Sequence, residues 1–286
     1  MLVITIADAT LGAVVEGFDL RELDGTTWPA IEAAFHDHAV LVFPAQHLDD
    51  AAHLAFSRWF GPLERATAVP RPDQRADFTR LANTDGDGAV VHDPTSRVVQ
   101  SLVGNQEWHS DSSFKRIAAK ASILAAVVVP AEGGETQFAD MRAAYDTLDA
   151  ATKTQIEDLV CEHSLMYSRG SLGMLDYSEE ERAMFRPVRQ RLVRTHPVSG
   201  RKSLYLSSHA GAILGMPMPE ARILLRDLNE HATQPKFVYV HQWRVGDLVM
   251  WDNRQMMHRV RRYDEGQPRD MRRTTVAGTA ATTAQA

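Results

Sequence analysis

Short runs of β-branched and aromatic residues lie near both ends of the chain, and this distribution constrains the fold most. Strands are predicted at residues 2–6, 39–43, 121–129, 236–244, 247–251, 256–260 and 272–278. Helical patterns lie between them, at 27–35, 49–61, 140–150, 152–159, after Ser178 and at 219–231. Strands and helices do not alternate regularly, which disfavours a parallel sheet. The pattern predicts an α+β fold with a jelly-roll-like β core and inserted and flanking helices.

We expect residues 1–286 to form a single domain, because this length suits one β-rich enzyme domain and no repeat or linker divides the chain. Residues 65–100 are rich in proline, glycine and aspartate and lack steady periodicity. Long irregular loops in compact domains are usually functional, so this segment is a candidate lid over an active site. The Ala/Thr-rich tail at 277–286 is predicted to be disordered.

The composition, with 44% hydrophobic and 24% charged residues, is that of a globular protein. A net charge of −6 disfavours a general nucleic-acid binder. The exception to this acidic balance is a group of six arginines from Arg259 to Arg273. This group could be a solvated face or a small RNA-binding patch, and the acidic residues among the arginines disfavour the patch. With Cys161 as the only cysteine and its longest apolar run confined to 121–131, the chain is expected to be cytoplasmic and not membrane-anchored.

The segment QEWHSDSSF places His109 and Asp111 two residues apart. On a strand these side chains would point to one face and could reach one metal ion. This spacing alone is weak evidence for a metal site, because His47-Leu48-Asp49 has the same spacing and Asp49 is better explained as a helix cap. His258 is the best candidate for a third ligand. Two histidines and one carboxylate form the facial triad of iron(II) oxygenases, which leaves coordination positions open.

Arg269 and Arg273 follow His258 with a spacing of four, which on a strand places both on one face. A guanidinium binds both oxygens of a carboxylate, so two inward arginines would match two anionic ligands. A zinc hydrolase or a non-catalytic metal-binding domain on a cupin-like barrel could use the same three metal ligands. The presence of both Thr136 and Arg269, whose roles the family resemblance below implies, disfavours both alternatives.

Several blocks, in order, carry a resemblance to a known family: WHSDSSF, GGETQFADMRAAYDTL, LYLSSHAGAILGMP, GDLVMWDNRQMMHR and RDMRRTT. Over residues 12–275 the chain resembles the TauD/TfdA family of Fe(II)- and 2-oxoglutarate-dependent dioxygenases, especially its 2,4-dichlorophenoxyacetate (aryloxyalkanoate) branch. The resemblance implies a double-stranded β-helix, with Fe(II), 2-oxoglutarate and O2 as cofactor and co-substrates. It implies iron ligands at His109, Asp111 and His258.

The resemblance also implies the roles of residues around the iron. Thr136 and Arg269 align with residues that hold the distal carboxylate of 2-oxoglutarate. Arg273 aligns with a position that meets the acidic group of the substrate or supports the co-substrate. Asn105 matches a position that lines the substrate pocket, and His209 lies in a block shared with the herbicide-degrading branch.

The substrate implied is a small organic acid, hydroxylated beside an ether oxygen and cleaved to a phenol and a 2-oxo acid. A taurine or alkylsulfonate substrate is the alternative within the family. Residues 64–84 lack the lysines expected in the herbicide enzyme and offer instead Arg65, Arg71, Arg75 and Arg80. The family also implies a homo-oligomer.

Overall fold

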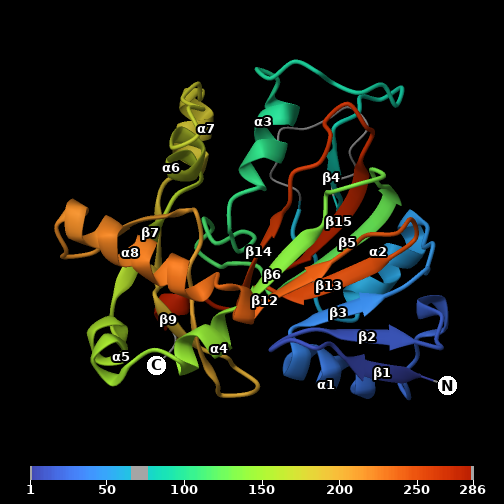
Figure 1. Ribbon diagram of the computed structural model, residues 1–286, viewed down its shortest axis with the longest axis horizontal. Helices are drawn as coiled ribbons and strands as arrows, with labels where there is room; N and C mark the ends of the chain where they lie inside the picture. Colours follow the sequence, from blue (N-terminus) through green and yellow to red (C-terminus); the bar gives the residue numbers. More distant parts are fainter. Residues whose placement is uncertain (1, 66–76, 285–286) are drawn as a thin grey trace.

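The computed structural model describes residues 2–65 and 77–284 (Figure 1). Its largest sheet has seven strands, and all neighbours are antiparallel except β2 and β3. Across the sheet the order is β1 (Val3–Ile6), β2 (Ala13–Glu16), β3 (Val40–Phe43), β13 (Leu248–Asp252), β5 (Ala121–Val128), β15 (Asp270–Val276) and β4 (Thr79–Ala82). The two ends of the chain therefore meet in one sheet, as the distribution of strand-like runs suggests.

Three smaller sheets complete the strands that the structure describes. They are β12 (Val238–His241), β6 (Thr136–Asp140) and β14 (Met256–Val260); β11 (Ala210–Ile213), β7 (Val160–His163) and β8 (Val188–Arg191); and β10 (Lys202–Leu204) with β9 (Val193–Thr195). The strand predicted for 236–244 is shorter than expected, because a 3-10 turn, η2 (Pro235–Phe237), takes its first residues.

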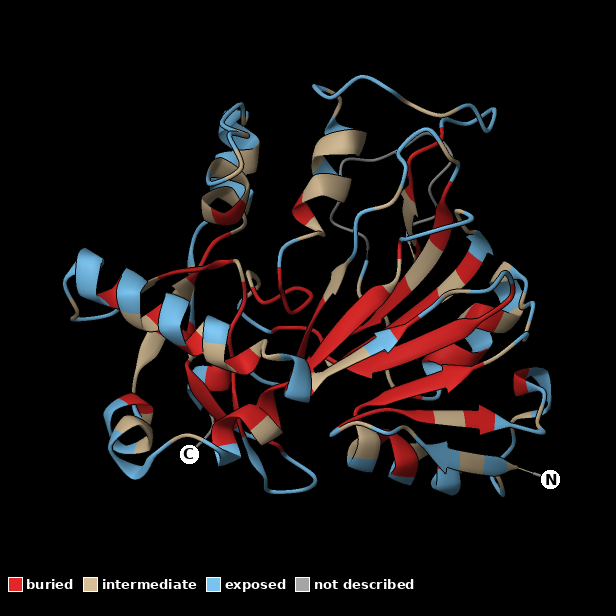
Figure 2. Ribbon diagram, in the orientation of Figure 1, coloured by how far each residue is buried: buried red, intermediate tan, exposed pale blue. Residues whose placement is uncertain are grey.

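Alternate residues of the large sheet enter two different cores, as the pleat of a strand requires. Leu41 and Met250 pack with the first two helices, whereas Val42 and Trp251 pack with Phe138 of the β12–β6–β14 sheet. The large sheet is thus covered on both faces, and its central strands are buried along their length (Figure 2). Burial on both faces explains why the sequences of β3 and β13 are almost continuously apolar, without alternating polar residues.

The helices cover the sheets and fill one end of the molecule. They are α1 (Trp28–His38), α2 (Asp50–Arg58), α3 (Arg97–Gly104), α4 (Met141–Asp146), α5 (Ala150–Ile156), α6 (Leu165–Gly170), α7 (Glu179–Met184) and α8 (Met218–Ala232), with 3-10 turns η1 (Leu20–Glu22) and η3 (Thr282–Ala284). The helix predicted after Ser178 is α7, and Ser178 and Glu181 form a capping box at its start. A third core, around α4 and α8, encloses Cys161 of β7, and burial raises the pKa of its thiol to about 12.

Two segments differ from the sequence-based expectation. The 65–100 segment is not wholly irregular, because it contains β4, which gains its ladder from β15, and α3, which Ser96 caps by accepting from Val99. The tail is also not disordered over 277–284, since buried Thr282 donates to Gln190 Oε1 at 2.6 Å. Tertiary partners, which local composition does not reveal, order β4, α3 and residues 277–284; residues 66–76 and 285–286 lie outside the described residues.

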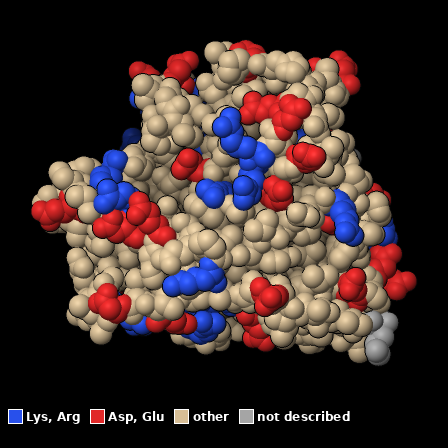
Figure 3. Space-filling view, in the orientation of Figure 1, with Lys and Arg blue, Asp and Glu red and all other residues tan. Residues whose placement is uncertain are grey.

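The surface carries interspersed charges. On the face seen in Figure 3, basic and acidic side chains are interspersed, and a small group of basic side chains near the upper centre is bordered by acidic ones. The arginines near the end of the chain are engaged with other groups: Arg272 pairs with Asp50 at 2.5 Å and Arg259 stacks on Trp108. None of the helices that the structure describes is long and apolar enough to cross a membrane.

Candidate active site

A two-residue backbone bridge joins His109 and His258. The amide of His109 donates to the His258 carbonyl at 3.0 Å, and the amide of His258 donates back at 2.8 Å. The two imidazole rings consequently lie side by side, with their centroids 4.2 Å apart. His258 comes from β14, whereas His109 lies just outside any strand. The strand expected at His109 to Asp111 is therefore reduced to this one bridge.

Asp111 begins a turn over residues 111–114, and its carboxylate lies beside both histidines. Ser112, the next residue, has a left-handed backbone with φ 55°. The Asp111 Oδ1 atom lies 3.9 Å from His109 Nε2, and Oδ2 lies 3.5 Å from His258 Nε2. One ligand atom from each residue thus falls within 4.8 Å of the other two.

Burial and charge give these three groups the protonation states that a metal requires. Desolvation lowers the pKa of His109 and of His258, so both rings are neutral at pH 7. Burial would raise the pKa of Asp111, but the charge of Arg273, with a hydrogen bond from Ser122, opposes this effect and holds the pKa well below its usual range. The His109 Nδ1 atom lies 2.7 Å from the Glu107 carbonyl and donates to it, which leaves Nε2 as a free electron-pair donor.

A cation already lies beside the carboxylate. Arg273 of β15 donates from Nη1 to Asp111 Oδ1 at 2.5 Å. Two neutral imidazoles and one carboxylate form a donor set that suits a divalent cation, and Arg273 supplies positive charge beside that carboxylate.

A cavity opens on this cluster between β6, β14, β15 and α3. It is lined by Leu81, Asn83, Val91, Val99, Leu102, Val103, Asn105, Gln106, His109, Leu124, Thr136, Trp251, His258, Val260, Tyr263, Glu265, Arg269 and Arg273. The cavity therefore brings together Asn105, Thr136, Arg269 and Arg273, which sequence reasoning selected from distant parts of the chain.

Arg269 is a buried cation without a carboxylate partner among residues 2–65 and 77–284. Its side chain is 4% exposed, its Nε atom has no hydrogen-bond partner there, and burial lowers the pKa of its guanidinium to about 10. Thr136, on the same cavity wall, accepts a hydrogen bond from Trp243 Nε1 at 2.9 Å. Because its oxygen accepts there, the Thr136 hydroxyl proton is free to be donated into the cavity.

Other predicted residues lie elsewhere. His209 does not line the cavity: its ring lies 6.4 Å from that of His109, and its Nδ1 lies 2.7 Å from Ser168 Oγ. Arg80 pairs with Asp270 at 2.9 Å and is occupied by it. Arg71 and Arg75 lie outside the described residues, and Arg65 is exposed.

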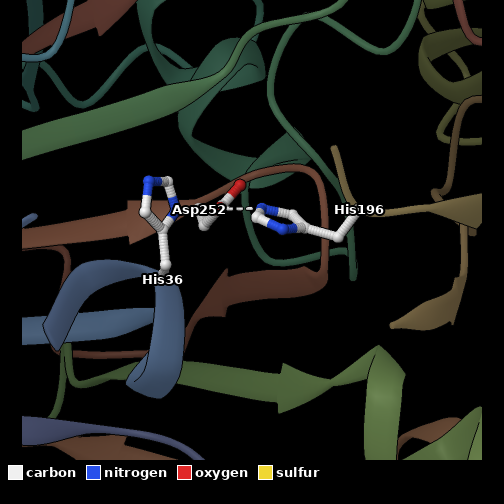
Figure 4. Close-up of side chains that lie close together, drawn as sticks. All are labelled: His36, His196 and Asp252. Atoms are coloured by element: carbon white, nitrogen blue, oxygen red, sulfur yellow. Dashed lines mark hydrogen bonds and ion pairs between the residues drawn. The ribbon is translucent and has the colours of Figure 1, made fainter. Parts of the chain in front are cut away.

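A second group of the same composition lies nearby. His36 of α1, His196 and Asp252 at the end of β13 place their ligand atoms within 4.8 Å of one another (Figure 4). Arg254, however, already contacts both oxygens of Asp252, at 2.8 Å and 2.6 Å. None of the three residues lines the cavity. This cluster is a neutralised buried carboxylate, not a second metal centre.

Sequence reasoning missed the residues that support the cluster. Ser122 donates to Asp111 Oδ2 at 2.6 Å, and the Asp111 amide donates to Asn253 Oδ1 at 3.1 Å. Asn83 accepts from the Arg269 amide at 2.8 Å and fixes the start of β15. One signal was available, because Asn253 follows Trp251 and Asp252 immediately after a buried strand, where an amide side chain needs a partner.

The fold and this cluster agree with a family model described as taurine catabolism dioxygenase TauD, TfdA family, which matches residues 5–275. The chain belongs to this family. One similar protein is the alpha-ketoglutarate-dependent 2,4-dichlorophenoxyacetate dioxygenase of Cupriavidus pinatubonensis, 47% identical over 268 residues that cover 92% of this chain and 93% of the relative. The (S)-phenoxypropionate/alpha-ketoglutarate-dioxygenase of Sphingobium herbicidovorans is 41% identical and covers 95% of this chain and 93% of the relative.

A solved structure gives the same relationship in three dimensions. The crystal structure of AAD-2 in complex with Mn(II) and N-oxalylglycine is 55% identical in sequence, with a TM-score of 0.92 and coverage of 100% of both chains. A taurine dioxygenase structure from Burkholderia xenovorans is more distant, at 28% identity and a TM-score of 0.79, and covers 97% of this chain and 90% of the other.

Proposed function

We propose that this protein is an Fe(II)- and 2-oxoglutarate-dependent dioxygenase that hydroxylates an aryloxyalkanoate and so cleaves its ether bond. One observation carries the proposal: two neutral histidines and an ionised aspartate lie at a cavity that also contains a buried arginine without a carboxylate partner among the described residues. A zinc hydrolase would have no use for that second feature. The 2,4-dichlorophenoxyacetate and phenoxypropionate dioxygenases among its relatives support the substrate class.

The metal ligands in this proposal are His109, Asp111 and His258. When bound, iron(II) would supply the chemistry that couples oxidative decarboxylation of 2-oxoglutarate, to succinate and CO2, with hydroxylation of a C–H bond. The two imidazoles hold no competing proton at neutral pH, because burial lowers their pKa. A bound cation would take over the charge that Arg273 supplies to Asp111, which would free the Arg273 guanidinium to face the cavity.

Arg269 and Thr136 bind the distal carboxylate of 2-oxoglutarate in this proposal. The buried guanidinium offers a fork of donors, and the Thr136 hydroxyl has its proton available because its oxygen accepts from Trp243. Hydrogen bonds between charged partners in a buried site are strong and directional, so these two residues would fix the orientation of the co-substrate.

The substrate would lie between Arg273 and α3. Its carboxylate would pair with the released Arg273, and its ring would contact the apolar cavity wall of Val99, Leu102 and Val103. Hydroxylation beside the ether oxygen gives a hemiacetal, which collapses to a phenol and a 2-oxo acid. Asn105, which also lines the cavity, would contact the ring or the ether oxygen.

The core in this proposal is a double-stranded β-helix. The support is the pair of sheets, β1–β2–β3–β13–β5–β15–β4 and β12–β6–β14, that enclose a shared core and present the metal ligands at one end of it. Chain crossings between the two sheets, from β5 to β6 and from β13 to β14, fit such a roll.

The deciding experiment is a substrate panel. Purified protein is supplied with Fe(II), 2-oxoglutarate and O2, and succinate is measured with 2,4-dichlorophenoxyacetate, each phenoxypropionate enantiomer, taurine and an alkyl sulfate. We expect succinate with an equal amount of phenol from an aryloxy acid. Release with taurine or the sulfate alone would favour the alkylsulfonate alternative. Turnover that is independent of O2 and 2-oxoglutarate would overturn the reaction class.

Replacing Arg269 with alanine tests the co-substrate site. The dissociation constant for 2-oxoglutarate should rise by about 10- to 100-fold, the range expected for losing hydrogen bonds between charged groups, while metal affinity changes little. Titration calorimetry under argon measures both constants. Arg272→Ala is the matched control, because Arg272 lies on β15, which Arg269 immediately precedes, and pairs with Asp50 away from the cavity. Equal losses in both variants would show that the wrong arginine has been chosen.

A further inference from the structure

The two oxygens of the Asp111 carboxylate have different partners. Oδ1 accepts from the Arg273 guanidinium, whereas Oδ2 accepts from the Ser122 hydroxyl at 2.6 Å. The Ser122 contact is neutral and 0% exposed, so neither water nor a ligand from the cavity reaches it. Oδ1 therefore lies against a cation, whereas Oδ2, which is also 3.5 Å from His258 Nε2, is already engaged by a fixed donor inside the protein.

Ser122 sits on a rigid part of the molecule. It belongs to β5, in the middle of the seven-stranded sheet, and it is paired with Trp251 of β13 on one side and with Thr275 of β15 on the other. A side chain on a strand that is hydrogen-bonded along both edges has little freedom to move away from its partner. The position of its hydroxyl is thus set by the sheet.

Asn253 determines the direction in which that hydroxyl donates. Its Oδ1 atom accepts from two groups that can only donate, the Asp111 amide at 3.1 Å and Trp251 Nε1 at 3.1 Å. This fixes the side-chain amide, so Nδ2 must face Ser122, where it donates to Oγ at 2.9 Å. Because Oγ accepts from Asn253, the hydroxyl proton points to Asp111 Oδ2.

We propose that Ser122, oriented by Asn253 and Trp251, is a positioning residue that reserves one oxygen of Asp111 and so keeps this ligand to a single metal bond. This inference rests on the proposed metal site. A carboxylate can bind one metal through both oxygens. If Oδ2 were released, it could take a position on the metal that 2-oxoglutarate or O2 requires. The network Ser122–Asn253–Trp251 is thus expected to act on co-substrate binding more than on metal binding.

The test compares Ser122→Ala with a matched control, Ser203→Ala. Ser203 is also a fully buried strand serine, and it donates to the Arg254 carbonyl at 3.3 Å, outside the network. Titration calorimetry under argon measures two constants for each variant: Mn(II) binding to the metal-free protein, and 2-oxoglutarate binding to the Mn(II)-loaded protein. Ser122→Cys keeps the volume but donates only weakly, and it serves if Ser122→Ala is too unstable to purify.

We expect Ser122→Ala to bind Mn(II) within about threefold of the wild type and 2-oxoglutarate about tenfold more weakly, with Ser203→Ala changing neither. A merely structural role would lower the thermal midpoint of Ser122→Ala without separating the two constants. Equal losses of both constants, or no loss of either, would overturn the inference while leaving the metal site in place. Failure of the wild type to bind Mn(II) would overturn both proposals.

Discussion

The two His-His-Asp clusters have the same composition and differ in what neutralises the carboxylate. Asp252 accepts two hydrogen bonds from the side chain of Arg254, and further contacts from His196 and Gln255 occupy its Oδ2 atom. Asp111 accepts from a serine on one oxygen and from a single Arg273 nitrogen on the other. Only the second arrangement adjoins the cavity, which Arg273 also lines.

The difference shows that ligand types within reach do not by themselves define a metal site. A carboxylate whose acceptor positions are filled by a nearby arginine has no free lone pair with which to bind a metal ion. Displacing that arginine would leave its charge buried and unpaired. Arg254 is two residues from its partner in the turn after β13, so it is held close by the chain. Arg273 comes from a separate strand and has a cavity into which it can withdraw.

Substitutions of the two aspartates should have the largest effects, and the effects should differ in kind between the two clusters. Asp111→Ala should abolish Mn(II) binding and succinate release in a protein that remains folded. Asp252→Asn should leave Arg254 buried without a counter-charge and lower the free energy of unfolding by about 3–5 kcal/mol. Denaturant unfolding and metal titration of both variants measure these effects. Weakened metal binding in folded Asp252→Asn, with unchanged stability, would reverse the roles assigned to the clusters.

His163 contrasts with the histidines of both clusters, because it is buried and has neither a carboxylate nor any other hydrogen-bond partner among the described residues. Burial lowers its pKa to about 3, so the folded state resists the proton that the unfolded chain binds below pH 6.5. Stability is therefore lost as pH falls from 6.5 toward 3, by about 2 kcal/mol at pH 5 from this residue. The His163 imidazole stacks on Tyr205, and the phenyl ring of His163→Phe can stack there in the same way. Because phenylalanine binds no proton, the part of the stability loss that comes from residue 163 should disappear in this variant.

Unfolding of wild type and His163→Phe in denaturant at pH 7.5 and at pH 5 measures the difference. The variant should lose less stability than the wild type between the two values. Identical losses would show that His163 is protonated in the folded protein, and hence that a partner stabilises its charged form.

The smallest effect is expected at the other His-x-Asp pair, His47 and Asp49. Asp49 caps α2 by accepting from the Ala52 amide at 2.8 Å. Asp49→Ala should cost about 1 kcal/mol of unfolding free energy and leave Mn(II) affinity unchanged. Thermal unfolding with and without Mn(II) distinguishes the two quantities, and a reduced stabilisation by metal would contradict the assignment of Asp49 as a cap.

The sequence allowed most strands and the ligand pattern to be predicted, because strand-like runs and His-x-Asp spacing are local. The bridge between His109 and His258 joins residues far apart in the chain and could not be predicted from either neighbourhood. β4 could not be predicted for the same reason, since the short run Thr79–Ala82 becomes a strand only through its ladder with β15. α3 was not predicted, although its sequence contains the signals of a helix: Ser96 is a suitable N-cap, and Val99, Leu102 and Val103 have the spacing of an apolar helix face.

The burial of Cys161 makes the protein convenient to probe. The thiol is the only one in the chain and is buried on β7, in the core around α4 and α8. Its pKa is raised to about 12, so it is unreactive toward alkylating reagents at neutral pH. A cysteine introduced on the exposed side of α3, for example at Ser101, would then be the single labelled site. A fluorophore or spin label there would report directly whether the cavity wall moves when metal and 2-oxoglutarate bind.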